Sequence, residues 1–151
     1  MKRKLRPPKV LIGWREWVEL PSLGIERIKA KIDTGARTSA LHADVVRTYH
    51  RAGRCFVTFR VHPTQRSLSP ELEVHAEMID ERQVRSSSGK AELRPVILTT
   101  LQLGEERWPI EITLTRRDLM GFRMLLGRQA LRRRVRIDPG RSFLLGRQSR
   151  T

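Results

Sequence analysis

Asp33, Thr34 and Gly35 place a carboxylate, a hydroxyl and a glycine at consecutive positions. A positioned carboxylate can act as a general acid or base. Asp and Thr can hydrogen-bond the local backbone, and glycine permits conformations and close approaches that other residues resist. Residues 28–32 alternate apolar and charged side chains, which is typical of a half-buried strand. These residues therefore predict a strand that delivers a catalytic carboxylate to a tight turn.

A second segment, Met124–Leu131, lies roughly ninety residues after the first. Its apolar residues predict a short strand that ends at Gly127, and a short helix over 128–133 follows. Asp-Thr-Gly alone is often only a turn, since short motifs match by chance. An early Asp-Thr-Gly-Ala together with a late apolar-apolar-Gly-Arg is more specific, and it resembles the half-domain of retropepsin-like aspartic proteases. In that family the second element packs across the active-site loop.

The resemblance extends to a bacterial family called ATP-dependent zinc proteases, whose RimB-like members are associated with RimK-type ATP-grasp ligases. The matching segments are Gly13–Val18, Lys31–His42, Val84–Val96 and Met120–Leu131. They imply an all-β, retropepsin-like (acid protease) closed β-barrel with one or two short helices. Many short alternating segments at regular spacing favour the same barrel. Within it, we expect one or two helical turns over residues 41–48.

The length of 151 residues suffices for one domain with its own core. We expect a disordered basic arm at 1–8, a single retropepsin-like domain at 9–146 and a flexible tail at 147–151. No signal-peptide-like apolar stretch follows the basic start, and no apolar run is long enough to span a membrane. Cys55 is the single cysteine, so no internal disulfide can form. These features predict a cytoplasmic protein that makes no membrane contact.

One aspartate is insufficient for acid–base hydrolysis of a peptide bond. Aspartic proteases use two facing carboxylates that share one proton, because both cannot be charged at close range, and the pair titrates as a unit. This sequence contains a single Asp-Thr-Gly, so the mechanism predicts a two-fold homodimer with Asp33 of each subunit at the axis. The resemblance implies that Thr34 locks the two loops together, that Gly35 lets them approach and that Ala36 packs beneath.

The formal net charge of +15 predicts attraction to a polyanion: a nucleic acid, an anionic surface or an acidic polypeptide. Low aromatic content argues against recognition of single strands by stacking, and no helix-turn-helix, zinc-finger or RNA-recognition motif is present. Arginines close to the two motifs would make the cleft basic, which suits an acidic peptide because arginine grips carboxylates with paired hydrogen bonds. The arginines at 132–136 are expected to be solvated or to contact ribosomal RNA.

RimK-type ligases append glutamates to a small-subunit ribosomal protein, so the resemblance implies a partner protease that trims or cleaves such tails. Residues 85–90 predict a polar hairpin tip that covers the cleft as a flap, and the alternative is a covering element within 44–84. The catalytic residues expected are Asp33, Thr34 and Gly35. The residues expected to contact substrate are Lys31, Ala36, Arg37, Thr38, His42, Arg85, Ser86, Lys90, Arg94 and Arg128.

The histidines His42, His50, His62 and His75 are spaced widely and irregularly. No His-Glu-x-x-His motif and no cysteine pair accompany them, so we expect no metal site. The sequence also lacks a Gly-x-x-x-x-Gly-Lys phosphate loop, and a chain filled by the barrel has no room for a nucleotide domain; we expect no cofactor. Two alternatives to the aspartic peptidase remain. One is a non-catalytic basic adaptor that binds the ribosome or another polyanion, and the other is a zinc-dependent peptidase, as the family name says.

Overall fold

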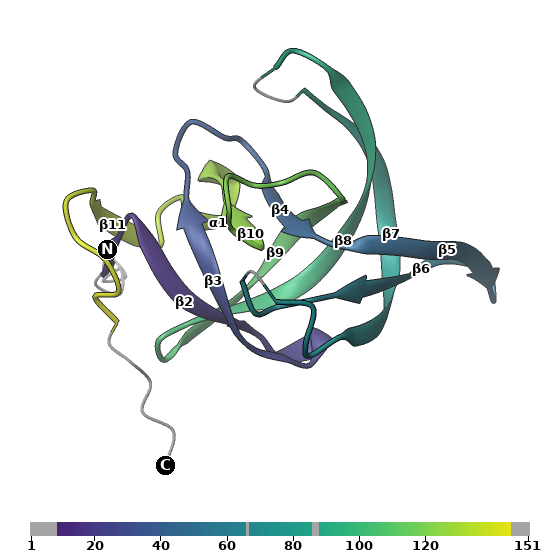
Figure 1. The fold of residues 1–151 in the computed structure, drawn as a ribbon, viewed down its shortest axis with the longest axis horizontal. Helices are drawn as coiled ribbons and strands as arrows, with labels where there is room; N and C mark the ends of the chain where they lie inside the picture. The colour runs from purple at the N-terminus through teal and green to yellow at the C-terminus, as the bar shows by residue number, and fades with distance from the viewer. Residues whose placement is uncertain (1–8, 66, 86–87, 146–151) are drawn as a thin grey trace, which may run out of the picture.

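The computed structural model describes residues 9–65, 67–85 and 88–145 (Figure 1). The arm expected at 1–8 and the tail expected at 147–151 lie outside the described residues, as does Ser86. Among the residues described, no helix is both long enough and apolar enough to cross a membrane.

Strands that are far apart in the chain close into a ring, which confirms the predicted all-β barrel. In order around the ring they are β2 (Arg15–Leu20), β3 (Ile25–Ile32), β10 (Met124–Leu126), β4 (Ser39–His42), β9 (Glu106–Thr115) and β8 (Ala91–Leu103). Glu19 on β2 pairs with Gln102 on β8, which joins the first strand of the ring to the last. Fully buried side chains such as Ile28 and Ala30 fill the interior, as the alternation in the sequence predicts.

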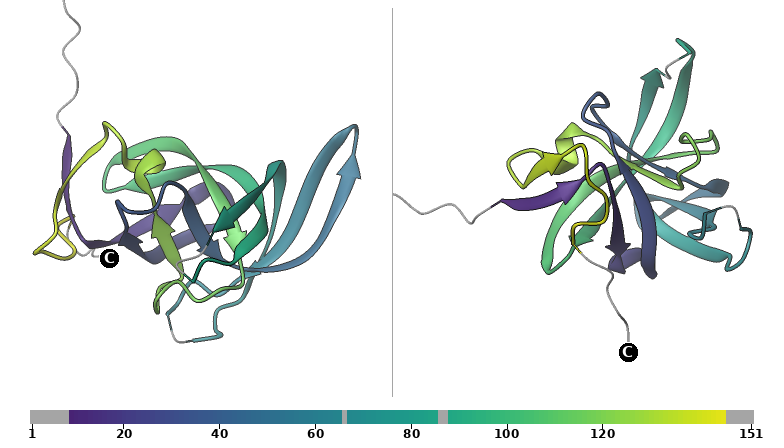
Figure 2. Two further views of the ribbon diagram at one scale, coloured as in Figure 1. Left: turned by 90° about the horizontal axis from the view of Figure 1, so that it is seen from above. Right: turned by 60° about the vertical axis from the view of Figure 1, so that its left-hand side comes forward.

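Three further strands continue the sheet beyond β8 and leave the ring (Figures 1 and 2). They are β7 (Leu72–Arg85), β6 (Arg54–Val61) and β5 (Asp44–Arg51), joined by antiparallel pairing. The helix predicted over 41–48 is wrong, because these residues complete β4 and form the first part of β5. Tyr49 on β5 stacks on Phe56 of β6 with ring centroids 5.5 Å apart, and such cross-strand packing outweighs a weak local preference for helix.

Short helices and a small second sheet complete the described fold. A 3-10 helix, η1 (Pro21–Leu23), connects β2 to β3, and α1 (Arg128–Leu131) follows β10. The first described strand, β1 (Val10–Gly13), pairs in parallel with the last, β11 (Val135–Asp138). The small sheet therefore brings the two ends of the described chain together.

The buried carboxylate of Glu16 ties the last described residues to the start of β2. Glu16 is only 1% exposed. Its oxygens accept hydrogen bonds from the backbone N–H groups of Gly13, Leu144 and Leu145 at 2.7, 2.8 and 3.3 Å. Because a buried polar group must be compensated by hydrogen bonds, these three donors offset the cost of burying the Glu16 side chain.

Replacing Glu16 with Gln is expected to lower the free energy of unfolding by about 1–2 kcal/mol, because the single amide oxygen can keep the bonds from Gly13 and Leu144, while the NH₂ faces the half-buried Leu145 N–H and leaves it unpaired. Urea denaturation followed by circular dichroism measures this change. Glu105→Gln, at an exposed position in the turn between β8 and β9, is the matched control and should leave stability unaltered. Equal midpoints for the two variants would show that Glu16 does not hold the C-terminal segment.

Candidate active site

The strand β10 lies between β3 and β4, although it comes far later in the chain. It pairs in parallel with β3 and antiparallel with β4. Asp33 follows β3 directly, and its backbone N–H donates to the carbonyl oxygen of Leu126 at 2.9 Å. The segments around Asp33 and Leu126, which are far apart in the sequence, thus meet at the end of β3, where the proposed catalytic carboxylate lies.

Asp33 stabilises the start of the active-site loop, which we define as residues 33–38. The Asp33 Oδ1 atom accepts a hydrogen bond from the Gly35 N–H at 2.9 Å, and its carbonyl oxygen accepts one from the Ala36 N–H at 3.2 Å. A Cβ atom at position 35 would lie 3.2 Å from Asp33 Oδ1, so glycine keeps the first of these bonds unobstructed. Asp33 is half-buried, whereas Thr34 and Gly35 are exposed. The turn therefore orients the carboxylate and leaves its neighbours at the surface.

Gly127 lets the start of α1 approach the active-site loop. A Cβ atom at this position would lie 2.5 Å from Thr38 O and 2.9 Å from Ala36 O, which is closer than real Cβ contacts. The Gly127 N–H donates to Ser39 Oγ at 3.1 Å, and the next N–H, that of Arg128, donates to Ala36 O at 2.8 Å. Glycine is therefore required at this position, and the second motif packs across the loop as the resemblance implied.

The side chain of Arg128 forms hydrogen bonds with the backbone of the active-site loop. Its Nη1 atom donates to the carbonyl oxygens of Thr34 and Gly35 at 3.0 and 3.1 Å. Arg128 and Thr34 line a smaller pocket of about 430 Å³, together with apolar residues that include Leu131. The sequence predicts a substrate contact for Arg128, and this stays a prediction. In the structure its guanidinium lies on two carbonyl groups of the active-site loop.

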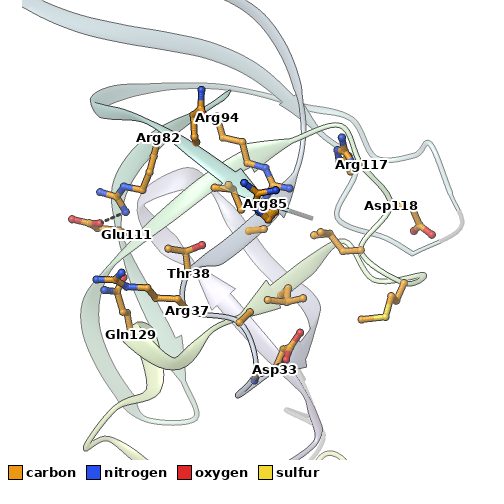
Figure 3. Close-up of a pocket in the computed structure, with 18 of the residues that line it drawn as sticks. Asp33, Arg37, Thr38, Arg82, Arg85, Arg94, Glu111, Arg117, Asp118 and Gln129 are labelled. Carbon is orange, nitrogen blue, oxygen red and sulfur yellow. Dashed lines mark hydrogen bonds and ion pairs between the residues drawn. The ribbon is translucent and has the colours of Figure 1, made fainter. Parts of the chain in front are cut away.

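Asp33 lines a larger pocket of about 1040 Å³ (Figure 3). The walls of this pocket come from the active-site loop, the hairpin of β7 and β8, and the segment 117–120. The pocket brings together these residues predicted from the sequence: Asp33, Gly35, Ala36, Arg37, Thr38, Arg85 and Arg94. The sequence analysis missed these polar lining residues: Arg82, Gln83, Ser88, Glu111, Arg117, Asp118 and Gln129. Ser88 belongs to the hairpin tip predicted to cover the cleft, whereas nothing local in the sequence indicates that the other six side chains line the same pocket as Asp33.

Four predicted contact residues lie outside the lining of the larger pocket: Lys31, His42, Lys90 and Arg128. Lys31 Nζ is 3.4 Å from Met120 Sδ, and His42 Nδ1 is 3.3 Å from Arg123 Nη1. Lys90 is exposed on the hairpin of β7 and β8. Proximity to a motif in the sequence therefore does not by itself bring a side chain into the pocket.

Arginines dominate the part of the pocket that lies away from Asp33 in Figure 3. Arg82 forms ion pairs with Asp80 and Glu111, each at 3.0 Å, and the hydrogen bond to Glu111 is the main cause of its raised pKa. Among the residues described, no carboxylate lies within ion-pair distance of Arg37. Positive charge in this pocket is thus only partly compensated by the protein and is available to an anionic ligand.

The histidines and acidic residues of the described chain do not fit a zinc site. No group of three or more His, Cys, Asp or Glu side chains in this part of the chain could hold a metal ion. His62 Nε2 contacts Glu71 Oε2 at 3.1 Å, and His75 Nδ1 contacts Thr58 Oγ1 at 3.0 Å. His42 lies beside a guanidinium. The possible metal-binding atoms therefore point to separate partners and do not converge.

His42 predicts a specific pH dependence of stability. Burial, assisted by the positive charge of Arg123, lowers the pKa of His42 below its ordinary value of 6.5. Between the lowered pKa and 6.5 the unfolded chain binds more protons than the folded chain, so the His42 contribution to stability falls as the pH drops through this window. Above pH 6.5 this contribution should be constant. Urea denaturation of the wild type and of His42→Asn from pH 5 to 8 measures the difference, and parallel curves would contradict the assignment.

The fold and the site define a class of protein. A closed barrel with β10 between β3 and β4, and an Asp-Thr-Gly turn where these strands meet, is the arrangement expected of a retropepsin-like domain. A family model described as "Retropepsin-like aspartic endopeptidase RimB" matches residues 11–148. The chain belongs to this RimB-like family, which confirms the resemblance predicted from its motifs.

The chain is also similar to parts of longer curated proteins. A protein of Shewanella halifaxensis is 46% identical over 141 residues, which cover 93% of this chain and 31% of that protein. A protein of Parasynechococcus marenigrum is 47% identical over 138 residues, which cover 91% of this chain and 30% of that protein. Both are named "Probable alpha-L-glutamate ligase". The chain thus spans less than a third of the length of these relatives.

A solved structure shares the fold. The crystal structure of a Legionella pneumophila protein with unknown function superposes with a TM-score of 0.76 at 26% sequence identity. The match covers 92% of this chain and 100% of that chain. The barrel and its outer strands are therefore common to both proteins.

Proposed function

We propose that this chain is a homodimeric aspartic endopeptidase that hydrolyses peptide bonds in acidic substrates, including the poly-glutamylated tail of a ribosomal protein. The proposal rests on one observation: Asp33, at the end of β3, lines a pocket that is also lined by Arg37, Arg85 and Arg94. Membership of the RimB-like family supports the peptidase reaction. The basic lining supports an acidic substrate, because guanidinium groups pair with carboxylates.

In the proposed mechanism, Asp33 of each subunit acts on one water molecule. The ionised carboxylate takes a proton from the water molecule as the water oxygen attacks the peptide carbonyl carbon. At the same time the protonated carboxyl of the other subunit donates its proton to the peptide carbonyl oxygen. When the C–N bond breaks, the newly protonated carboxyl donates its proton to the leaving nitrogen. The other carboxylate takes a proton from a hydroxyl group of the tetrahedral intermediate. The pair then again holds one proton. The exposure of Thr34 and Gly35 supports a contact with a second copy of the loop.

The names of the curated relatives support a glutamate-chain substrate. Those proteins are named as glutamate ligases, and this chain corresponds to less than a third of each. We infer that a domain found in one chain with such a ligase acts on the same kind of polymer. The net charge of +15 supports attraction to an acidic tail and to the surface of a ribosome, which would place the reaction in the cytoplasm.

The test is cleavage of a peptide that carries an oligoglutamate tail, with an oligoglutamine tail of equal length as the control. We expect cleavage of the glutamate peptide that is unaffected by a metal chelator. Cleavage that stops with chelator and returns with zinc would replace the aspartic mechanism by a metal-dependent one. Binding of the tail without cleavage would favour the non-catalytic adaptor.

A further inference from the structure

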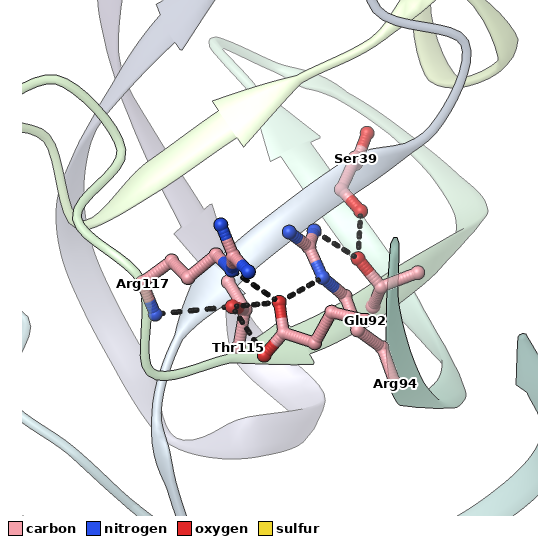
Figure 4. Close-up of polar contacts among 6 residues, drawn as sticks. Ser39, Glu92, Arg94, Thr115 and Arg117 are labelled. Atoms are coloured by element: carbon pink, nitrogen blue, oxygen red, sulfur yellow. Dashed lines mark hydrogen bonds and ion pairs between the residues drawn. The ribbon is translucent and has the colours of Figure 1, made fainter. Parts of the chain in front are cut away.

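One carboxylate holds two arginines in the wall of the larger pocket (Figure 4). Glu92 Oε2 accepts hydrogen bonds from Arg94 Nε at 2.9 Å and pairs with Arg117 Nε at 3.1 Å. The hydroxyl of Thr115 donates to both oxygens of Glu92, at 3.2 and 3.0 Å, and accepts the backbone N–H of Arg117 at 3.0 Å. The position and orientation of both guanidinium groups therefore depend on Glu92.

The burial of this cluster differs from that of an ordinary surface ion pair. Arg94 is only 6% exposed, and the Glu92 side chain is 27% exposed. Both Arg94 and Arg117 line the pocket that Asp33 also lines. Two positive charges share one negative charge, so the cluster keeps a surplus positive charge, and the charge of Arg94 is poorly solvated. Such a charge interacts strongly with an anion that enters the pocket.

A chain of hydrogen bonds connects this cluster to the active-site loop. Arg94 Nη1 is 3.5 Å from Thr113 Oγ1, and the Thr113 hydroxyl donates to the carbonyl oxygen of Ser39 at 2.9 Å. The hydroxyl of Ser39 accepts the backbone N–H of Gly127 at 3.1 Å. Thr113 and Ser39 are each 1% exposed. The guanidinium of Arg94 is thus held on the same buried framework that holds the active-site loop.

We propose that Glu92 is a positioning residue that holds Arg94 and Arg117 as a receptor for a side-chain carboxylate of the substrate, so that the pocket distinguishes a glutamyl from a glutaminyl residue. This inference rests on the proposed peptidase function and adds the residues that select its substrate. Arginine binds a carboxylate with paired, directional hydrogen bonds, so its contribution depends on orientation as well as on charge. An uncharged amide would leave the surplus charge unpaired.

Glu92→Gln separates orientation from charge, because it makes the pocket wall more positive by one charge while leaving a single neutral amide oxygen in place of the carboxylate that holds both arginines and the Thr115 hydroxyl. If charge alone selected the substrate, this variant would prefer the glutamyl peptide more strongly than the wild type does. If Glu92 acts by orienting the arginines, the ratio of kcat/KM for glutamyl over glutaminyl peptides should fall at least about tenfold, mainly through KM. Arg94→Lys should lower the ratio similarly, since lysine cannot form the paired hydrogen bonds.

Glu77→Gln is the matched control, because Glu77 pairs with Arg54 at 2.8 Å in an ion pair with exposed side chains that lies outside the pocket lining. It should leave the ratio unaltered. Arg117→Gln, whose side chain is 36% exposed, provides a variant that folds even if the buried Arg94 does not tolerate change. An unaltered or increased ratio in Glu92→Gln and Arg117→Gln, with wild-type melting temperatures, would overturn the inference.

Calorimetric binding to the Asp33→Asn chain keeps this test separate from the proposed function. If the wild type cleaves neither peptide, the peptidase proposal fails, and binding of the same two peptides still measures selection. If Arg94 and Arg117 form this receptor, Glu92→Gln in the Asp33→Asn background should weaken binding of the glutamyl peptide about tenfold more than binding of the glutaminyl peptide. Equal weakening of both, or none, would contradict it.

Discussion

Replacing Asp33 with Asn is expected to lower the rate of peptide hydrolysis by about 10³–10⁴-fold, because the amide can neither take a proton from water nor donate one to the carbonyl oxygen as a carboxyl pair does. The side-chain oxygen can still accept the Gly35 N–H, so the active-site loop and the binding of an acidic peptide should persist. Single-turnover cleavage of the oligoglutamate peptide measures the rate, and calorimetry measures binding.

Asp118→Asn is the matched control for Asp33→Asn, since Asp118 lines the same pocket and its Oδ1 accepts the Gly121 N–H at 2.9 Å. This variant should retain cleavage. Mixing wild-type and Asp33→Asn chains in equal amounts tests the dimer: random exchange places half of the wild-type subunits in inactive heterodimers, so activity should fall to about half. Undiminished activity after exchange would contradict a site shared by two subunits, and full activity of Asp33→Asn would remove Asp33 from the mechanism.

Gly127→Ala is the second change with a large expected effect. The new Cβ atom would lie 2.5 Å from Thr38 O, which belongs to the backbone of the active-site loop and cannot rotate away. We expect a loss of about 3 kcal/mol in the free energy of unfolding and a loop displaced enough to abolish cleavage. Urea denaturation and the peptide assay measure the two effects.

Gly140→Ala is the control for the loss of a glycine itself. A Cβ atom there would lie 3.5 Å from Asp138 Oδ1, an ordinary van der Waals distance. This variant should unfold and cleave as the wild type does. Wild-type stability and activity in Gly127→Ala would show that the contact between α1 and the active-site loop is not needed.

The sequence by itself predicted the all-β barrel and the two motifs that form the candidate active site. The alternation at 28–32 predicted both a strand and its buried face, because side chains on a strand point to opposite sides in turn. The Asp-Thr-Gly turn was recognisable because its carboxylate accepts the N–H of the glycine two residues later, which is a local pattern. Gly127 was recognisable only as part of the family pattern, because what requires glycine there is the backbone of a distant segment, at Thr38 and Ala36.

Only the tertiary structure decided which basic side chains surround Asp33. Arg82 and Arg117 line the pocket because the register of β7, β8 and β9 brings distant segments together. Lys31, two residues from Asp33, does not line it; its Nζ lies 3.4 Å from Sδ of Met120, which does. Strand pairing also overrode the helix expected over 41–48, because Leu41 and His42 pair with the distant strand β9 and residues 44–48 pair with the neighbouring strand β6. The physical reason is the same in each case. Local sequence sets the conformation of a segment, whereas the neighbours of a side chain in a pocket depend on which distant strands pair and in which register.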